Sequence, residues 1–178
     1  MRFYEALDLE PKLALDLDDL KRRFYERSRQ WHPDRFARGS PAEQEKALEM
    51  TAVLNDAFRT LRDPNARAEY FFKEKGIQLP KEAPPDVLQE FFELNMELEE
   101  LRGGDESVRP QVATSYELIL EMREQTDAAL AGLFELYDRN EDMRPKLIPT
   151  AGDLLNVRRY ISNYVRVAGK ELNVPLPN

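Results

Sequence analysis

The chain has 178 residues, of which 42% are hydrophobic and 34% are charged, and it contains no cysteine. This composition supplies enough apolar side chains for one large core or two small ones, and it excludes disulfides and thiolate-held iron–sulfur clusters. No stretch approaches the roughly 18–20 apolar residues of a membrane helix, and the N-terminus has no signal-peptide or transit-peptide features. We therefore expect a cytoplasmic protein that does not act at a membrane.

The net charge of −8 is distributed unevenly along the chain. Residues 1–79 carry 15 basic and 15 acidic side chains, whereas residues 80–178 carry 11 and 19. Within the neutral first part, residues 21–38 contain seven Lys or Arg and two acidic residues, a local charge of +5. Because the pI is near 4.9, nucleic acid is not an expected partner, but the basic segment suits an acidic protein surface.

Helical patterns fill the chain and no alternating run of Val, Ile or Thr predicts a strand, so we expect an all-α fold. A short helix covers part of 2–8. Asp16 predicts the start of a helix over 17–31, and the apolar stripe of that helix includes Leu20, Phe24 and Trp31. Arg27 falls on the same stripe, where we expect its stem to lie along the packed surface.

A proline stops this helix, and a second helix begins soon after it. Pro33 disfavours helical geometry at His32 and offers no backbone donor. The stretch "SPAE" then predicts a new helix with a capping box formed by Ser40 and Glu43. This helix ends before "RDPN", and a further helix runs to Gly76, so the N-terminal part is predicted to be a helical hairpin with a short extra helix.

Three prolines in the segment 77–86 mark a domain boundary. We therefore divide the chain into an N-terminal domain at 1–76, this proline-rich linker, and a C-terminal domain at 87–178. Three helical segments follow the linker, over about 87–102, 107–139 and 150–172. Short loops between three helices predict an up-down bundle.

Capping signals give the expected limits of the bundle helices. Asp86 with Gln89 imitates a capping box for the first helix, and two consecutive glycines close that helix. The last helix is expected to begin near Thr150, with Asp153 in its first turn.

The stretch "WHPDRF" at 31–36 holds the only histidine of the chain. A histidine beside a carboxylate suggests catalysis or a metal, but a rigid proline separates the two, and neither a nucleophile nor a further set of ligands accompanies them. A helix stop with a polar turn is a second, structural interpretation. The third is a rigid loop that presents an imidazole and a carboxylate to another protein, because a proline-fixed loop loses little entropy on docking. We expect neither a metal nor a cofactor here.

The helix before this turn has a cationic face opposite its apolar stripe. At 100° per residue, the side chains that point away from the stripe are Arg22, Tyr25, Glu26 and Arg29, and Lys21 lies on the flank. This face continues into the turn and suits an acidic partner.

Two apolar rows lie on the helix over 87–102. A 4-3-4-3 spacing predicts a core stripe made of Val87, Phe91, Leu94, Leu98 and Leu101. A second row lies about 100–180° away, and is either packed on a neighbouring helix or exposed as an interaction site: Leu88, Phe92 and Met96. The polar rim of this row consists of Gln89, Glu93 and Glu100.

These features resemble the J domain and, more narrowly, HscB, the iron–sulfur J-protein. "HPD" alone is a match of three residues, but "HPDRF" followed by "GSPAEQ" and then by "LRDPNARAEYFF" at this spacing is specific. The resemblance covers most of the chain, more loosely after residue 105. The chain lacks the zinc-binding CxxC pair of some members and so resembles the bacterial form, and Arg27 stands where the family usually has an apolar residue.

The resemblance implies an N-terminal J-domain helical hairpin, a C-terminal three-helix bundle and a role as co-chaperone in iron–sulfur cluster assembly. The HPD loop is then expected to dock on a DnaK/HscA-type chaperone and to stimulate the ATPase of that partner, so the chain itself is not expected to be an enzyme. The implied contact residues are His32, Pro33, Asp34, Lys21, Arg22, Tyr25, Arg29 and Arg35.

The same resemblance implies that the bundle holds an IscU-like iron–sulfur scaffold. The matching positions are Leu88, Gln89, Phe92, Glu93, Met96, Glu100 and Tyr160. Phe92 is larger than the aliphatic residue expected at its position. The alternatives are a J-domain adaptor for another client, a helical enzyme that uses His32, and a purely structural helical scaffold.

Overall fold

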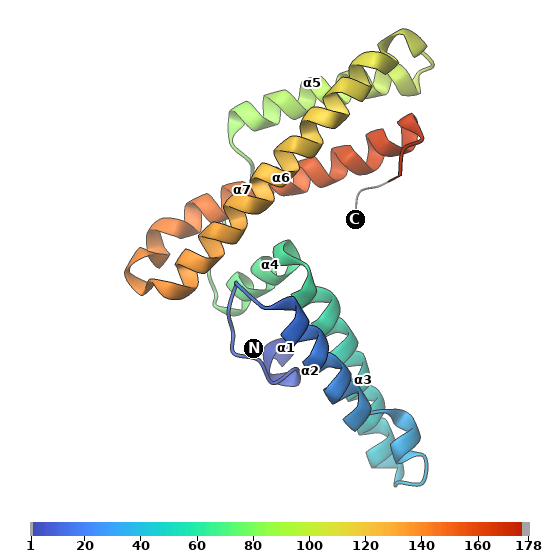
Figure 1. Cartoon of the computed structure of the whole chain (residues 1–178), viewed down its shortest axis with the longest axis vertical. Coiled ribbons are helices and arrows are strands. Elements are labelled where there is room, and N and C mark those ends of the chain that lie inside the picture. The colour runs from blue at the N-terminus through green and yellow to red at the C-terminus, as the bar shows by residue number, and fades with distance from the viewer. Residues whose placement is uncertain (1, 176–178) are drawn as a thin grey trace. The chain divides into compact units, whose positions relative to one another are not determined.

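The computed structural model describes residues 2–175, and over these residues the fold is entirely helical (Figure 1). Seven α-helices and three short 3-10 helices follow one another without a strand in this range, which confirms the all-α prediction. The helices pack into two compact units, Met1–Gln78 and Leu79–Asn178. The three-part division of the sequence at 1–76, 77–86 and 87–178 stays a prediction. Within residues 2–175, no helix is both long and apolar enough to cross a membrane.

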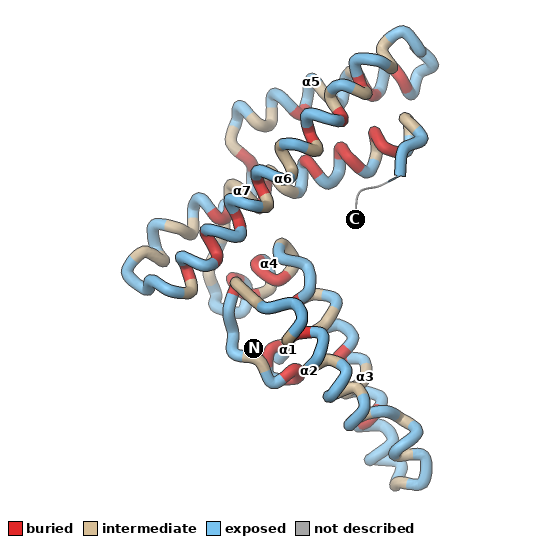
Figure 2. The backbone as a smooth tube through the Cα atoms, in the orientation of Figure 1, coloured by how far each residue is buried: buried red, intermediate tan, exposed pale blue. Residues whose placement is uncertain are grey.

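The N-terminal unit contains four α-helices and one 3-10 turn. They are α1 (Arg2–Ala6), α2 (Leu17–Gln30), η1 (Pro33–Phe36), α3 (Pro41–Arg62) and α4 (Pro64–Glu74). Helices α2 and α3 form the hairpin, and α1 packs on α3. In the hairpin, the ring of Phe24 stacks on the ring of Phe58 with 4.4 Å between the centroids. Figure 2 shows that exposed positions follow the outer sides of these helices.

The capping signals of this unit act as predicted. The side chain of Asp16 accepts hydrogen bonds from the backbone N–H groups of Asp18 and Asp19, at 2.8 and 3.1 Å. Ser40 and Glu43 form both halves of a capping box at the start of α3. Hydrogen bonds from the backbone and hydroxyl of Ser40 lower the pKa of the Glu43 carboxyl. These local signals fix where α2 and α3 begin, and therefore where the turn between them lies.

A buried guanidinium holds three segments of the N-terminal unit together. Arg67 on α4 is only 5% exposed. Its Nε donates to the carbonyl of Leu13 at 2.7 Å, and its Nη1 donates to the carbonyl of Leu61 at 2.6 Å. Leu13 lies in the loop before α2 and Leu61 lies at the end of α3. Arg67 therefore fixes the loop that leads into α2 against the end of its partner helix.

Arg27, which stands on the apolar stripe of α2, is half-buried. Its Nε donates to the carbonyl of Ala6 at 3.0 Å, and its Nη1 donates to the side chain of Gln30 at 3.1 Å. The charged side chain thus replaces an apolar contact with a hydrogen bond to the last residue of α1.

The C-terminal unit contains three long helices and two 3-10 turns. They are α5 (Pro85–Arg102), η2 (Glu106–Val108), α6 (Arg109–Arg139), η3 (Glu141–Met143) and α7 (Arg144–Leu172). Helix α6 packs along α7, and α5 contacts both. Where all three meet, the core includes Phe91, Leu98, Val112, Tyr116, Ile119, Ile161 and Tyr164. Burial raises the pKa of Tyr164 to about 12, and the charge of Glu97 adds to this shift.

The capping residue predicted for the start of α5 was wrong. Asp86 is not the N-cap, because the helix begins at Pro85 and no side chain caps it. Proline fits the first turn of a helix, since its φ is already fixed and its missing N–H has no helical partner there. Gln89 donates to Glu93 at 3.2 Å instead of closing a capping box. The expected end is confirmed, with Gly103 as the C-cap.

The predicted start of α7 was also wrong. The helix begins at Arg144, well before Thr150, and it passes through Pro149. A proline in the second turn removes one backbone hydrogen bond, and the packing of α7 compensates for this loss, so the helix continues past Pro149. The helix entry is also held by Arg144, whose Nε donates to the carbonyl of Tyr137 at 3.0 Å.

Replacing Arg67 with Met should destabilise the N-terminal unit by roughly 2–4 kcal/mol, because two buried carbonyls lose a charged donor. The chain has one tryptophan, Trp31, in this unit, so urea unfolding followed by tryptophan fluorescence measures the effect. Arg59→Met is the matched control, since Arg59 on α3 is exposed and pairs only with Asp56 at 2.8 Å. Equal midpoints for the two variants would contradict the role given to Arg67.

Candidate functional site

The turn formed by His32, Pro33 and Asp34, here called the HPD turn, is exposed and is held in one conformation by a hydrogen bond to its own backbone. His32 is the N-cap of η1, and its Nδ1 accepts a hydrogen bond from the backbone N–H of Asp34 at 3.3 Å. This bond requires an unprotonated Nδ1. The Nδ1 atom also lies 3.5 Å from the Asp34 carboxylate, and the two side chains are 59% and 91% exposed. The imidazole and the carboxylate are therefore both available to a partner.

The residues that flank the turn contact each other and helix α3. The rings of Trp31 and Phe36 stack with 5.8 Å between their centroids, and the Lys46 ammonium lies 5.6 Å from the centre of the Trp31 ring. The hydroxyl of Thr51 donates to the carbonyl of Trp31 at 3.2 Å. The amide of Gln44 donates to the carbonyl of Gly39 at 3.0 Å. Helix α3 thus holds both ends of the turn, so the apolar residues pack while His32 and Asp34 remain exposed.

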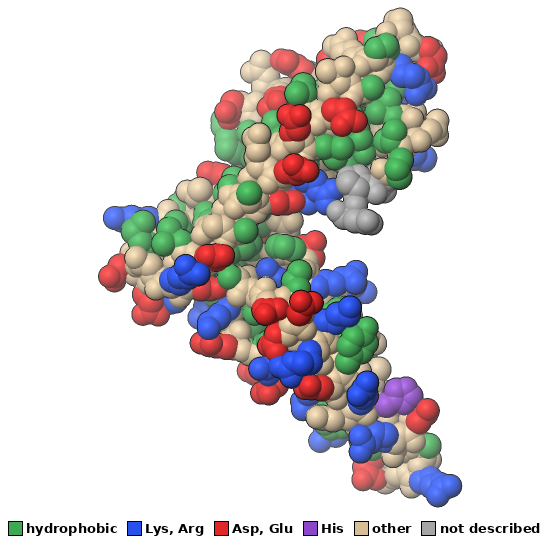
Figure 3. Space-filling view, in the orientation of Figure 1, with side chains coloured by type: hydrophobic (Ala, Val, Ile, Leu, Met, Phe, Trp, Pro, Cys, Tyr) green, Lys and Arg blue, Asp and Glu red, His purple; other side chains and the backbone are tan. Residues whose placement is uncertain are grey.

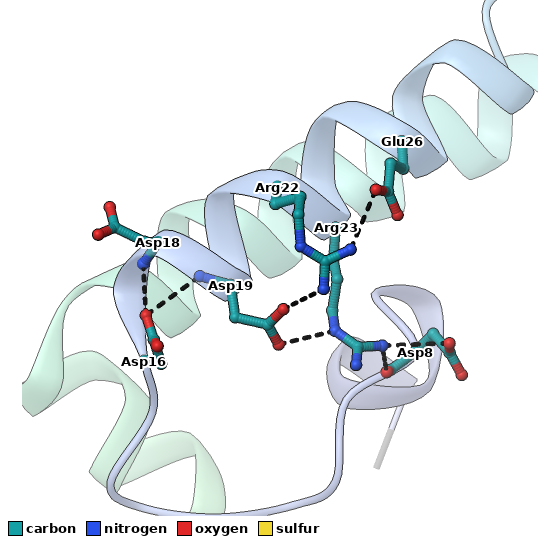
Figure 4. A network of polar contacts seen from close by, with 7 residues as sticks. All are labelled: Asp8, Asp16, Asp18, Asp19, Arg22, Arg23 and Glu26. Atoms are coloured by element: carbon teal, nitrogen blue, oxygen red, sulfur yellow. Dashed lines mark hydrogen bonds and ion pairs between the residues drawn. The ribbon is translucent and has the colours of Figure 1, made fainter.

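The cationic face of α2 is partly neutralised by acidic residues of the same unit (Figure 4). Arg22 pairs with Asp19 and with Glu26, the latter at 3.0 Å. Arg23 pairs with Asp19 at 2.8 Å and with Asp8 at 3.1 Å. Hydrogen bonds from Arg23 and Arg22 lower the pKa of the Asp19 carboxyl.

Other cations of this face have no such partner. In the described part of the chain, no ion pair involves Lys21, Arg29 or Arg38. Arg35 reaches back from the turn and its Nη1 donates to the carbonyl of Arg29 at 3.4 Å. Tyr25 on the same helix is 53% exposed. The positive charge available to an acidic partner therefore comes mainly from the unpaired cations.

The two apolar rows of α5 differ sharply in exposure. In the core row, Phe91 is 1% exposed and Leu98 is 2% exposed. In the second row, Phe92 is 65% exposed and Met96 is 53% exposed, while Leu88 is half-buried. The second row is therefore a surface feature of the C-terminal unit. Figure 3 shows hydrophobic and acidic side chains side by side on the visible face of this unit.

The polar rim of this row is exposed, as the sequence pattern indicates. Gln89, Glu93 and Glu100 all face solvent. Tyr160 on α7 is 37% exposed, and its ring lies 5.6 Å from the ring of Phe91. The structure thus places Tyr160 next to the residue that precedes Phe92, at the contact between α5 and α7.

Comparison with known proteins identifies both parts. Residues 2–70 match the family model of the DnaJ domain. The whole chain is similar to chaperone HscB from Vibrio cholerae, with 25% identity over 96% of each chain and a TM-score of 0.72. It also has the fold of the human co-chaperone protein HscB, with 22% identity over 97% of this chain and 83% of that one, and a TM-score of 0.71.

The chain contains a J domain and resembles HscB in fold. Residues 2–70 form this J domain, and the likeness to the chaperone HscB covers nearly the whole chain. Among the described residues, no three or more potential metal-ligating side chains lie together.

The sequence did not predict some of the contacts that hold the HPD turn in place. Lys46, Gln44 and Thr51 lie on the next helix, and their contacts with the turn depend on how the hairpin closes. The pairing of Arg22 with Asp19 and Glu26 had a sequence signal, because opposite charges three or four positions apart face each other on a helix. The roles of the predicted contact residues at both surfaces stay predictions.

Two consecutive residues test the exposure contrast on α5. Phe91→Ala should destabilise the bundle by about 3–5 kcal/mol, because it leaves a cavity in the core. Phe92→Ala should leave the bundle close to wild type, because its ring is mostly exposed. Thermal unfolding followed by circular dichroism compares the two variants, and Trp31 fluorescence reports separately on the J domain. A strongly destabilised Phe92→Ala variant would show that the second row is packed.

Proposed function

We propose that this HscB-type co-chaperone brings an IscU-like iron–sulfur scaffold to a DnaK/HscA-type chaperone and stimulates the ATPase of that chaperone. The HPD turn and the cationic face of α2 dock on the ATPase, and the second row of α5 binds the scaffold. The chain acts on the reaction of its partner and is not itself an enzyme. We place it in the cytoplasm, which agrees with a chain that contains no cysteine.

The observation that carries this proposal is that each compact unit exposes one surface suited to a protein partner. On the N-terminal unit, the partner-facing groups are polar and rigid: His32 and Asp34 beside unpaired cations. On the C-terminal unit, they are apolar with an acidic rim: Phe92 and Met96 beside Glu93. Surfaces of such different chemistry favour two different partners, since each matches a different complementary surface.

His32→Gln should abolish ATPase stimulation and leave the fold intact. The imidazole is 59% exposed and makes one local hydrogen bond, and the carbonyl oxygen of Gln can still accept that bond. A steady-state ATPase assay with the chaperone, run beside circular dichroism, measures both effects. Full stimulation by the variant would remove the HPD turn from the docking surface, whereas a loss of helicity would favour a purely structural turn.

The charge of α2 should affect the rate of association more than the rate of dissociation. Arg29→Ala removes an unpaired cation and should slow association about two-fold or more at low salt. Glu26→Gln removes one of the two acidic partners of Arg22, the one at 3.0 Å, and should accelerate association by a similar factor. Stopped-flow binding to the chaperone across a salt series is the measurement, because screening reduces these effects.

Asp56→Asn is the matched control for this charge series. It frees Arg59 on α3 from a similar exposed pair at 2.8 Å, but it lies outside the face of α2. Equal rates for Glu26→Gln and Asp56→Asn would mean that only net charge matters and that the α2 face has no special role.

Phe92→Ala should weaken scaffold binding roughly 30-fold, since a central apolar anchor contributes about 2 kcal/mol or more. Its stimulation of the ATPase without scaffold should remain at the wild-type level. Leu118→Ala is the matched control, because Leu118 on α6 is a 59% exposed apolar residue outside the row. Calorimetric titration against the scaffold decides: unchanged affinity for Phe92→Ala would place the client surface elsewhere on the bundle.

A further inference from the structure

The segment that precedes α5 is fixed to α7 by two residues with no role in either docking surface. Asn156 is 3% exposed, and its Nδ2 donates to the carbonyls of Pro80 and Glu82 at 2.9 and 3.0 Å. One buried amide therefore binds two carbonyls of the proline-rich segment. A buried donor pair of this kind is costly to leave unsatisfied, so the contact specifies one position for the segment.

Gly152, one turn earlier on α7, contacts the ring of Pro80. A Cβ atom on Gly152 would overlap Cδ of Pro80 and would lie 2.9 Å from its Cγ and 3.0 Å from its N. Only glycine permits this approach of the proline ring to the helix. Ala83, at the end of the same segment, is 4% exposed. The stretch 80–83 is thus attached to the bundle by two carbonyls, by the ring of Pro80 and by Ala83, while Lys81 and Glu82 are exposed. We call Gly152 and Asn156 the linker clamp.

The clamp leaves a very short free connection between the two units. On the J-domain side, the last backbone anchor is the N–H of Ile77, which donates to the carbonyl of Phe72 at 2.9 Å. On the bundle side, the first anchor is the carbonyl of Pro80. Only Gln78 and Leu79 lie between these anchors.

We propose that the linker clamp is a positioning device that couples scaffold binding to ATPase stimulation by keeping this connection two residues long. The inference rests on the proposed function. Two domains on a tether just long enough to span their partners hold these at a high effective concentration, and beyond that length the concentration falls roughly as the −3/2 power of tether length. Without the clamp, the next bundle anchor is the carbonyl of Pro84, which accepts from Leu88 at 3.1 Å. The free connection then grows from two residues to six, and the effective concentration falls about five-fold.

Two variants break the clamp by different physical routes. Asn156→Ala removes both hydrogen bonds. Gly152→Ala displaces Pro80 sterically, while it raises the helix propensity of α7, so a loss of helix stability cannot explain its effect. Asn163→Ala is the control, because Asn163 is an exposed residue of the same helix whose side chain accepts only a local bond from Arg166 at 2.8 Å.

Backbone ¹⁵N relaxation of the free protein tests whether the clamp exists. In the wild type and in Asn163→Ala, the amides of Lys81, Glu82 and Ala83 should have order parameters of about 0.8 or more. In both clamp variants they should fall below about 0.6. Order parameters that stay high in both variants would overturn the inference without reference to any partner.

The functional measurement is the factor by which an IscU-like scaffold increases ATPase stimulation by the co-chaperone. This factor should fall about five-fold in both clamp variants, while stimulation without scaffold and calorimetric affinity for the scaffold stay at the wild-type values. Coupling that survives in both variants, or a loss of scaffold affinity, would overturn the inference alone. A wild type without any scaffold-dependent increase would overturn the proposed function and the inference with it.

Discussion

The J domain depends on one buried guanidinium. Arg67 donates hydrogen bonds to the carbonyls of Leu13 and Leu61, which lie far apart in the sequence. Leu13 lies three residues before Asp16, the N-cap of α2, so the contact holds the loop from which α2 starts. The HPD turn lies at the other end of α2, so the contact supports the helix that carries the turn. A charged side chain can do this from the interior because its donors are hydrogen-bonded, here to two backbone carbonyls.

The two surfaces that we propose for docking share one physical pattern, in which an exposed residue directly follows an apolar one that anchors it. Trp31 stacks on Phe36 and contacts α3, and the next residue is His32. Phe91 fills the bundle core, and the next residue is Phe92. In each case the anchor fixes the backbone before a partner arrives, so docking does not have to order it.

Local signals could be read from the sequence, and contacts between distant segments could not. The Ser40 capping box and the glycine end of α5 depend on a few neighbouring residues, and the structure has them where the pattern predicts. The last helix was expected to begin near Thr150, yet α7 begins at Arg144 and runs through Pro149, because its packing and its entry at Arg144 outweigh one lost hydrogen bond. The two rows of α5 were visible as a pattern, but only the packed bundle shows which of them is covered. The contacts of Arg67, Lys46 and Asn156 had no signal at all, because their partners lie on other elements.

The charge of α2 illustrates why composition alone overstates an electrostatic surface. The segment 21–38 has a formal charge of +5, but Asp8 and Asp19 from outside it lie against Arg22 and Arg23 (Figure 4). Exposed pairs contribute little to stability, so their main effect is on what the surface offers to a partner. The unpaired cations lie on α2 and in the turn, at Lys21, Arg29 and Arg38. On the function proposed above, these cations would attract an acidic partner to the same face as His32 and Asp34, which favours a docking register that includes the HPD turn.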